Sequence, residues 1–274
     1  MKSLLLAVQF LTLMPITVGG NITAREIGRS AAFFPLVGAI QGLFMVLGLS
    51  IFSKVFPPDI TAGLLVMLLA YSSGGFDLDG LADTADALAV KSSGNKETDI
   101  EKRLLVMKDS SIGSIGVVAL IFVILLKFLF MRSLIIDLSF SSVAGILFLM
   151  PAFSKWITVP PMFHGTSARN DGLGKIFIEH AGIQGLLISS VLMAALCWVV
   201  VLAGFLSGAA GTIVSGAPGL FMLIFIFFYL LSLILVRFFH SRFGGLTGDH
   251  FGALTEVAEI ICLGVAYVWL RHSF

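Results

Sequence analysis

The chain has 274 residues, of which 58% are hydrophobic and 12% are charged, and its mean hydropathy is +1.04. A soluble domain carries about 25% charged residues, so a soluble protein is excluded. The formal net charge of +1 gives no reason to expect a nucleic-acid partner. No hydrophilic block is long enough to form a second core, and we predict one integral membrane domain over residues 1–274.

The apolar stretches predict helices in chain order. Residues 3–17 are apolar but short and broken by Pro15, and no small-residue cleavage pattern follows, so we predict a retained interfacial or re-entrant helix. A hydrocarbon core of roughly 30 Å needs about 20 apolar residues. The predicted spans are 31–52, 60–76, 112–132, 139–159, 184–206, 218–237 and 252–270, of which the second is the shortest. The expected fold is all-α, a polytopic membrane helix bundle of about seven transmembrane helices plus the short N-terminal helix.

The charges separate the two sides of this bundle. Thirteen of the seventeen lysines and arginines fall in the N-terminal segment and in the loops near 77–111, 155–184 and 238–251, and three fall on the other side. Lys127 lies within a span, where we expect it to snorkel toward the outer interface. Because positive residues favour the cytoplasmic side, the first set is predicted to be cytoplasmic, in the cell (inner) membrane.

Most acidic residues and histidines follow the same partition, with an acidic cytoplasmic loop at about 77–111. One polar, acid-rich face indicates a membrane enzyme that acts on cytosolic substrates. A transporter should instead place its charges near the middle of the membrane.

Residues 74–88 read GGFDLDGLADTADAL. If they are helical from Asp79, then Asp79, Asp83 and Asp86 lie within about 60° of one another on one face. Three like charges on one face repel unless a cation lies among them, and carboxylates at this spacing suit Mg²⁺, which completes its shell with water and substrate phosphates. The alternative is a solvated acidic helix end with Asp79 as the N-terminal cap.

A second cluster opens the last span, where residues 244–252 read GGLTGDHFG. Asp249 and Glu256 are seven positions apart and therefore nearly eclipsed on a helix. Glu256 and Glu259 lie a turn or more inside an apolar helix, where ionisable residues indicate function, unless they are close enough to the surface to be wet. A glycine-rich turn before a helix N-terminus also suits phosphate, and its candidate contacts are Gly245, Thr247 and Gly248.

Cations between these clusters are candidate phosphate contacts. Arg103 and Lys108 could bind pyrophosphate oxygens, and Lys155 is a plausible anion contact, although a snorkelling lysine fits it equally well. Gly113 and Gly116 are better explained by close helix packing.

Together these segments resemble the cobalamin synthase family, the adenosylcobinamide-GDP ribazoletransferases of the late vitamin B12 pathway. That family's signature is Gly-Gly-Phe-His-x-Asp-Gly-Leu-Ala-Asp-x-x-Asp-Gly, which 74–86 match nearly throughout. Further matches, in order along the chain, are 34–38, 107–110 with Gly113, 172–174 with Phe177, and 245–249 with Gly252 and Glu256. The departures are Asp77 in place of the usual His, Ala87 in place of Gly, and Leu13 in place of an Arg. Asp77 is therefore given little weight as a site residue.

The resemblance implies a Mg²⁺-dependent reaction between adenosylcobinamide-GDP and α-ribazole that forms adenosylcobalamin and releases GMP. If the acceptor is α-ribazole 5′-phosphate, the product is adenosylcobalamin 5′-phosphate. The candidate metal ligands are then Asp79, Asp83, Asp86, Asp249 and Glu256. The candidate base is Asp83 or Asp249. Besides the lipid bilayer, other late-pathway enzymes and a second copy of the chain are conceivable partners.

Two other functions are considered beside this reaction. A phospholipid-type alcohol phosphotransferase also places a row of aspartates at a membrane face. The Asp-Gly-x-x-Ala-Arg element usual in such enzymes is absent here, since Ala82 is followed by Asp83. A divalent-cation transporter would need acidic residues deeper across the membrane.

Overall fold

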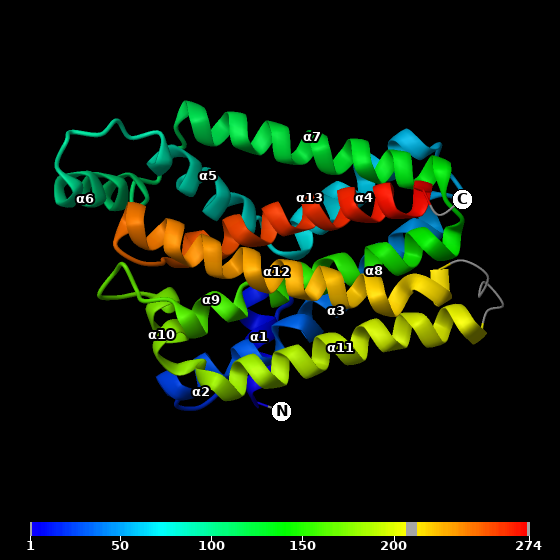
Figure 1. The fold of residues 1–274 in the computed structure, drawn as a ribbon, viewed down its shortest axis with the longest axis horizontal. Helices are drawn as coiled ribbons and strands as arrows, with labels where there is room; N and C mark the ends of the chain where they lie inside the picture. Colours follow the sequence, from blue (N-terminus) through cyan, green and yellow to red (C-terminus); the bar gives the residue numbers. More distant parts are fainter. Residues whose placement is uncertain (1, 207–212, 273–274) are drawn as a thin grey trace.

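A computed structural model describes residues 2–206 and 213–272, which are helical apart from their connections and form no strand. The helices run in chain order as follows: α1 (Lys2–Leu11), α2 (Ala24–Ser30), the 3₁₀ turn η1 (Ala31–Phe33), α3 (Phe34–Phe52), α4 (Pro58–Ser72), α5 (Phe76–Leu88), α6 (Lys96–Val106), α7 (Ser114–Asp137), α8 (Phe140–Trp156), α9 (Val159–His164), α10 (Leu173–His180), α11 (Gly182–Leu206), α12 (Ile213–Phe243) and α13 (Gly248–His272). The long helices lie side by side along one axis (Figure 1).

Within the described residues, six stretches are long and apolar enough to cross a membrane: Ala24–Phe52, Ser114–Asp137, Phe140–His164, Gly182–Gly204, Phe221–Phe243 and Gly248–Trp269. A seventh crossing is made only if α4 and α5 act together, because these two helices meet at an angle of 87°. The predicted all-α bundle of about seven spans, with a short N-terminal helix before them, is confirmed. This is the architecture of a multi-pass membrane protein.

The break between α4 and α5 corrects the second predicted span, which was drawn as one helix over 60–76. Gly74 and Gly75 have φ angles of 69° and 73°, a left-handed conformation that glycine adopts without the steric cost of a side chain. The chain turns there, and α5 begins at Phe76, three residues before the expected start at Asp79. Much of the stretch predicted as a loop over 77–111 is therefore helical, in α5 and α6.

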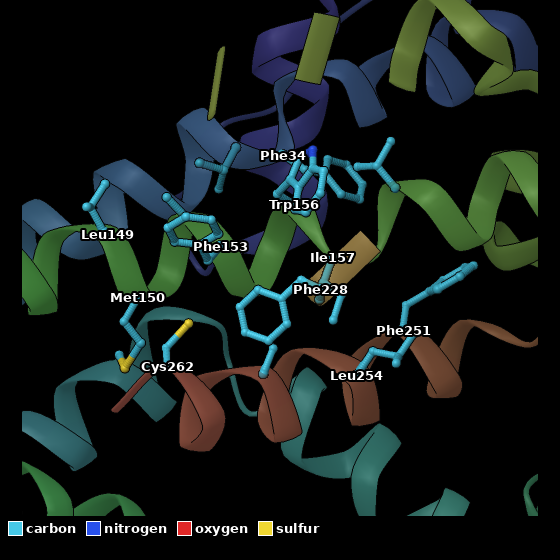
Figure 2. Packing of buried hydrophobic residues seen from close by; sticks show 14 of the residues in the cluster. Phe34, Leu149, Met150, Phe153, Trp156, Ile157, Phe228, Phe251, Leu254 and Cys262 are labelled. Atoms are coloured by element: carbon cyan, nitrogen blue, oxygen red, sulfur yellow. The ribbon is translucent and has the colours of Figure 1, made fainter. Parts of the chain in front are cut away.

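Close contacts between backbones hold the centre of the bundle. A Cβ atom added at Gly38 or Gly42 of α3 would stand 2.2 Å from a carbonyl oxygen of α8, so only glycine permits this crossing. Around it, Phe34 of α3, Trp156 of α8 and Phe228 of α12 belong to one buried cluster, drawn in part in Figure 2, in which the rings of Phe153 and Phe228 lie 6.0 Å apart between centroids. By contrast, few residues of α7, α11 and α12 are buried, namely 22%, 28% and 11% of their apolar windows, as expected of helices covered by lipid.

The connections that carry most of the lysines and arginines lie at one end of the bundle. The helices α6 and α10 and the turn from α12 to α13 lie together at the left of Figure 1. At the opposite end, Arg132 pairs with Asp59, and the hydroxyl of Tyr267 donates to Asp137 over 3.1 Å. The predicted partition of the loops between two ends therefore matches the fold, and we call the first the polar end.

Candidate active site

The core of the candidate site is the crossing of α5 and α13. A Cβ atom added at Gly80 would stand 2.6 Å from the carbonyl oxygen of Asp249, and one added at Gly252 would stand 3.0 Å from the Cα atom of Asp77. Each helix thus places a glycine against the backbone of the other at an aspartate. This contact brings the two predicted motifs together, although 155 residues lie between them in the sequence.

Three of the predicted carboxylates meet at this crossing: Asp79, Asp83 and Asp249, which we call the carboxylate cluster. The charges of Asp79 and Asp249 repel that of Asp83, and the charge of Arg169 attracts it. Arg169 also pairs with Asp249, with 3.2 Å between Nη2 and Oδ2. Across the described part of the chain, Asp79 and Asp83 take part in no ion pair, so two carboxylates remain available to a ligand.

The three carboxylates of the cluster do not form a complete metal-binding group. Among the described residues, no three His, Cys, Asp or Glu side chains are close enough to form a metal-binding group by themselves. Mg²⁺ is commonly held by only one or two carboxylates and takes its other oxygens from water and phosphates. Unpaired, mutually repelling carboxylates beside a partly exposed surface fit such an ion, with the substrate supplying the remaining oxygens.

Asp86 has a different role from its neighbours on α5. Its carboxylate accepts hydrogen bonds from the backbone N–H groups of Gly113 and Gly116, over 2.7 and 2.8 Å. A Cβ atom at Gly116 would stand 2.3 Å from Asp86 Oδ2, so the two glycines allow the close packing that was expected of them. Asp86 satisfies the free N–H groups at the start of α7, so its oxygens are occupied there, while its charge still repels that of Asp83.

Lys155, a candidate phosphate contact, is occupied by Asp77. Its side chain is buried, and its Nζ lies 2.5 Å from Asp77 Oδ2. The residue that departs from the family's usual histidine is therefore the partner of a buried lysine. Removing the charge of Asp77 would leave the ammonium group uncompensated inside the bundle.

Glu256 and Glu259 lie deeper along α13 and bind Lys127 of α7. Lys127 Nζ lies 2.6 Å from Glu256 Oε2 and also pairs with Glu259, and all three side chains are about 4% exposed. The expectation that Lys127 snorkels is wrong, because two carboxylates on the facing helix neutralise it within the bundle. Glu256 does not join the carboxylate cluster, and the lysine partner leaves it unsuited to metal binding or to conducting a cation.

The glycine-rich turn before α13 is held by its own chain. Leu246 pairs with Thr166 and Ala168 through backbone hydrogen bonds, and a Cβ atom at Gly245 would stand 2.6 Å from the carbonyl oxygen of Thr166. Buried Thr247 donates its N–H to His250 Nδ1 and its hydroxyl to Asp249 Oδ2, over 3.0 and 3.3 Å. Thr247 thus orients a cluster carboxylate, and of the three predicted phosphate contacts only Gly248 is exposed.

The remaining predicted cations lie elsewhere at the polar end. Lys108 is exposed. Arg103 is only 5% exposed, and its Nη1 donates to the carbonyl oxygen of Arg242 over 2.9 Å. The structure therefore places Arg103 between α6 and the end of α12 rather than beside the carboxylate cluster.

Comparison with known proteins gives a consistent result. Residues 3–267 match the family described as cobalamin-5-phosphate synthase. The chain belongs to the cobalamin-5-phosphate synthase family. Curated relatives named adenosylcobinamide-GDP ribazoletransferase include those of Thermodesulfovibrio yellowstonii, 37% identical over 94% of this chain and 93% of the relative, and of Pseudomonas aeruginosa, 35% identical over 96% of each. No solved structure matches. The resemblance predicted from the motifs is confirmed.

In this member of the cobalamin-5-phosphate synthase family, two site residues escaped the sequence reasoning. Arg169 pairs with Asp249 and donates to the carbonyl oxygen of Met107 over 3.2 Å, so it joins the cluster to the end of α6. His250 is fully buried, and its ring is stacked on Phe239 with 4.1 Å between centroids. In the sequence, His250 could have been recognised by its position next to Asp249. Arg169 could have been recognised only by its charge.

An apolar cavity of this family member lies away from the carboxylate cluster. It has a volume of about 510 Å³ and lies between α3, α8, α11, α12 and α13, with an almost entirely apolar lining that includes Phe153, Phe221 and Trp269. None of the carboxylate cluster contributes to it. The open, charged surface at the α5–α13 crossing is the better candidate for a highly charged substrate.

Proposed function

We propose that the protein transfers the adenosylcobinamide-phosphate part of adenosylcobinamide-GDP to α-ribazole or α-ribazole 5′-phosphate, with release of GMP. The observation that supports this most is the α5–α13 crossing, which brings Asp79, Asp83 and Asp249 together at the polar end. Family membership supplies the reaction class, and the cluster supplies the charges that a pyrophosphate transfer requires.

In this reaction a ribose hydroxyl of the acceptor attacks the phosphorus atom next to cobinamide. A new O–P bond forms, the P–O bond to GMP breaks, and the hydroxyl proton must leave. We assign Asp83 as the acceptor of that proton, because it lacks an ion-pair partner whereas Arg169 holds Asp249. Arg169 and Thr247 fix the position of Asp249, and a fixed carboxylate orients whatever it binds at little entropic cost.

Asp79 and Asp249 are the residues that would hold Mg²⁺, which commonly takes only one or two carboxylates from a protein, and Asp83 beside them accepts the proton. When bound, Mg²⁺ would supply positive charge that stabilises the phosphate oxygens. Asp86 and Glu256 are left out of this set, because backbone N–H groups and Lys127 already occupy them. The positive residues near the polar end support a cytoplasmic position for the site in the cell (inner) membrane.

The test is a reconstitution. Membranes that contain the protein, supplied with adenosylcobinamide-GDP, α-ribazole and Mg²⁺, are expected to release GMP and form cobalamin in equal amounts. Asp79→Asn and Asp83→Asn should abolish both products while the protein still inserts, because each loses a charge without much change in shape. Glu97→Gln, on exposed α6, is the control and should retain activity. Full activity in Asp79→Asn at low Mg²⁺ would remove that residue from the site.

A further inference from the structure

A second polar hollow lies at the polar end, apart from the carboxylate cluster. It has a volume of about 410 Å³ and is enclosed by the loop before α6, by one face of α6 and by the end of α12. The lining residues are all glycine, polar or charged: Ser92, Gly94, Lys96, Asp99, Arg103, Ser241 and Arg242. The hollow thus has three cations, one carboxylate and no apolar side chain.

The one carboxylate in this hollow is already satisfied. Asp99 accepts hydrogen bonds from the hydroxyls of Ser92 and Ser93, over 2.5 and 2.7 Å, and from the N–H of Ser93 over 2.7 Å. The hydrogen bond from Ser92, followed by those from Ser93, lowers the pKa of Asp99 to about 2. Asp99 is therefore ionised at neutral pH. Its charge also interacts with that of Arg103, but its oxygens accept their hydrogen bonds from the loop.

Arg103, in contrast, is left with unused donors. Its side chain is buried, it makes one hydrogen bond, to the Arg242 carbonyl oxygen, and its Nε finds no partner. A buried guanidinium group with an unpaired donor is costly unless a ligand or solvent completes its hydrogen bonds. Lys96 and Arg242 expose their side chains at the same hollow, and neither takes part in an ion pair with another described residue.

We propose that this hollow is an oxyanion site that binds a phosphate group, separate from the carboxylate cluster and independent of the proposed reaction. A phosphate accepts several charge-assisted hydrogen bonds at once, which matches a buried guanidinium flanked by two further cations. The absence of apolar lining gives a nucleobase nothing to stack on, so the site recognises the phosphate group itself. That group can come from inorganic phosphate, from a nucleotide or from a lipid headgroup.

The test measures binding to the full-length protein in nanodiscs of phosphatidylcholine, which carries no net charge, by calorimetric titration with inorganic phosphate and with GMP. Arg103→Gln is expected to weaken phosphate binding by about tenfold or more, since charged hydrogen bonds are among the strong ones. Lys96→Gln should weaken it several-fold, and because its side chain is exposed this variant carries the test if Arg103→Gln fails to fold. Lys102→Gln, exposed on the same helix but outside the hollow, is the matched control and should bind as the wild type does.

Three results distinguish the sources and the sites. Tighter binding of GMP than of phosphate supports a nucleotide as the source, and competition by phosphatidylglycerol nanodiscs supports a lipid headgroup. Undiminished phosphate affinity in Asp249→Asn, which should have strongly reduced transferase activity, supports a site separate from the carboxylate cluster. The proposal is overturned if the wild type binds no phosphate, if Arg103→Gln and Lys96→Gln both bind it as the wild type does, or if Asp249→Asn abolishes binding.

Discussion

The spacing of α5 and α13 is expected to control activity, and Gly80→Ala tests this directly. The new Cβ atom would stand 2.6 Å from the Asp249 carbonyl oxygen, whereas ordinary contact begins at 3.4 Å, so the two backbones must separate by about 0.8 Å. Overpacking of this kind costs roughly 1–3 kcal/mol of stability. A displacement of about 1 Å in a catalytic constellation can cost about 10²-fold in rate, so we expect turnover to fall by about that factor.

The assay is GMP release per mole of protein in nanodiscs, read beside the midpoint of thermal unfolding. Gly63→Ala is the matched control, because Gly63 lies in α4 and its added Cβ atom would meet nothing within 4 Å. That substitution should leave turnover unchanged and stabilise the helix by up to about 1 kcal/mol. If Gly80→Ala turns over within twofold of the wild type, the glycine contact does not set the geometry of the carboxylate cluster.

Three further outcomes are expected. Lys127→Met leaves two glutamates buried without their cation and should destabilise the protein by about 3–5 kcal/mol in reversible unfolding. Arg132→Gln breaks an exposed pair on the same helix and should cost only about 0–1 kcal/mol. Equal losses of stability in the two variants would contradict a buried charge network. Asp249→Asn should cut turnover strongly and raise the Mg²⁺ concentration needed for half-maximal rate, and an unchanged Mg²⁺ dependence would separate α13 from the metal site. Cysteines at Ser92 and Asn170 should react with a membrane-impermeant reagent from the cytoplasmic side only, and labelling from opposite sides would overturn the topology.

Local patterns in the sequence determined much of this protein. A run of about 20 apolar residues must form its hydrogen bonds internally in lipid and is therefore helical, so the spans and the clustering of loops at two ends followed from hydropathy and charge. The alignment of Asp79 with Asp83 is likewise local, since it depends only on helical periodicity. The break at Gly74 and Gly75 was visible as a glycine pair, but hydropathy could not show that the chain bends there.

The tertiary structure decided which charged groups remain free. Asp86 shares a helix face with Asp83 but lies beside the first N–H groups of α7, 27 positions away, and Glu256 meets Lys127 across 129 positions. No periodicity encodes such partners, because they depend on which helices pack together and at what rotation. Arg169, in a connection between helices, reaches Asp249 for the same reason. The sequence alone thus determined the helices and the carboxylates that chemistry could use, and only the packing of α5, α7 and α13 selected those that remain available for it.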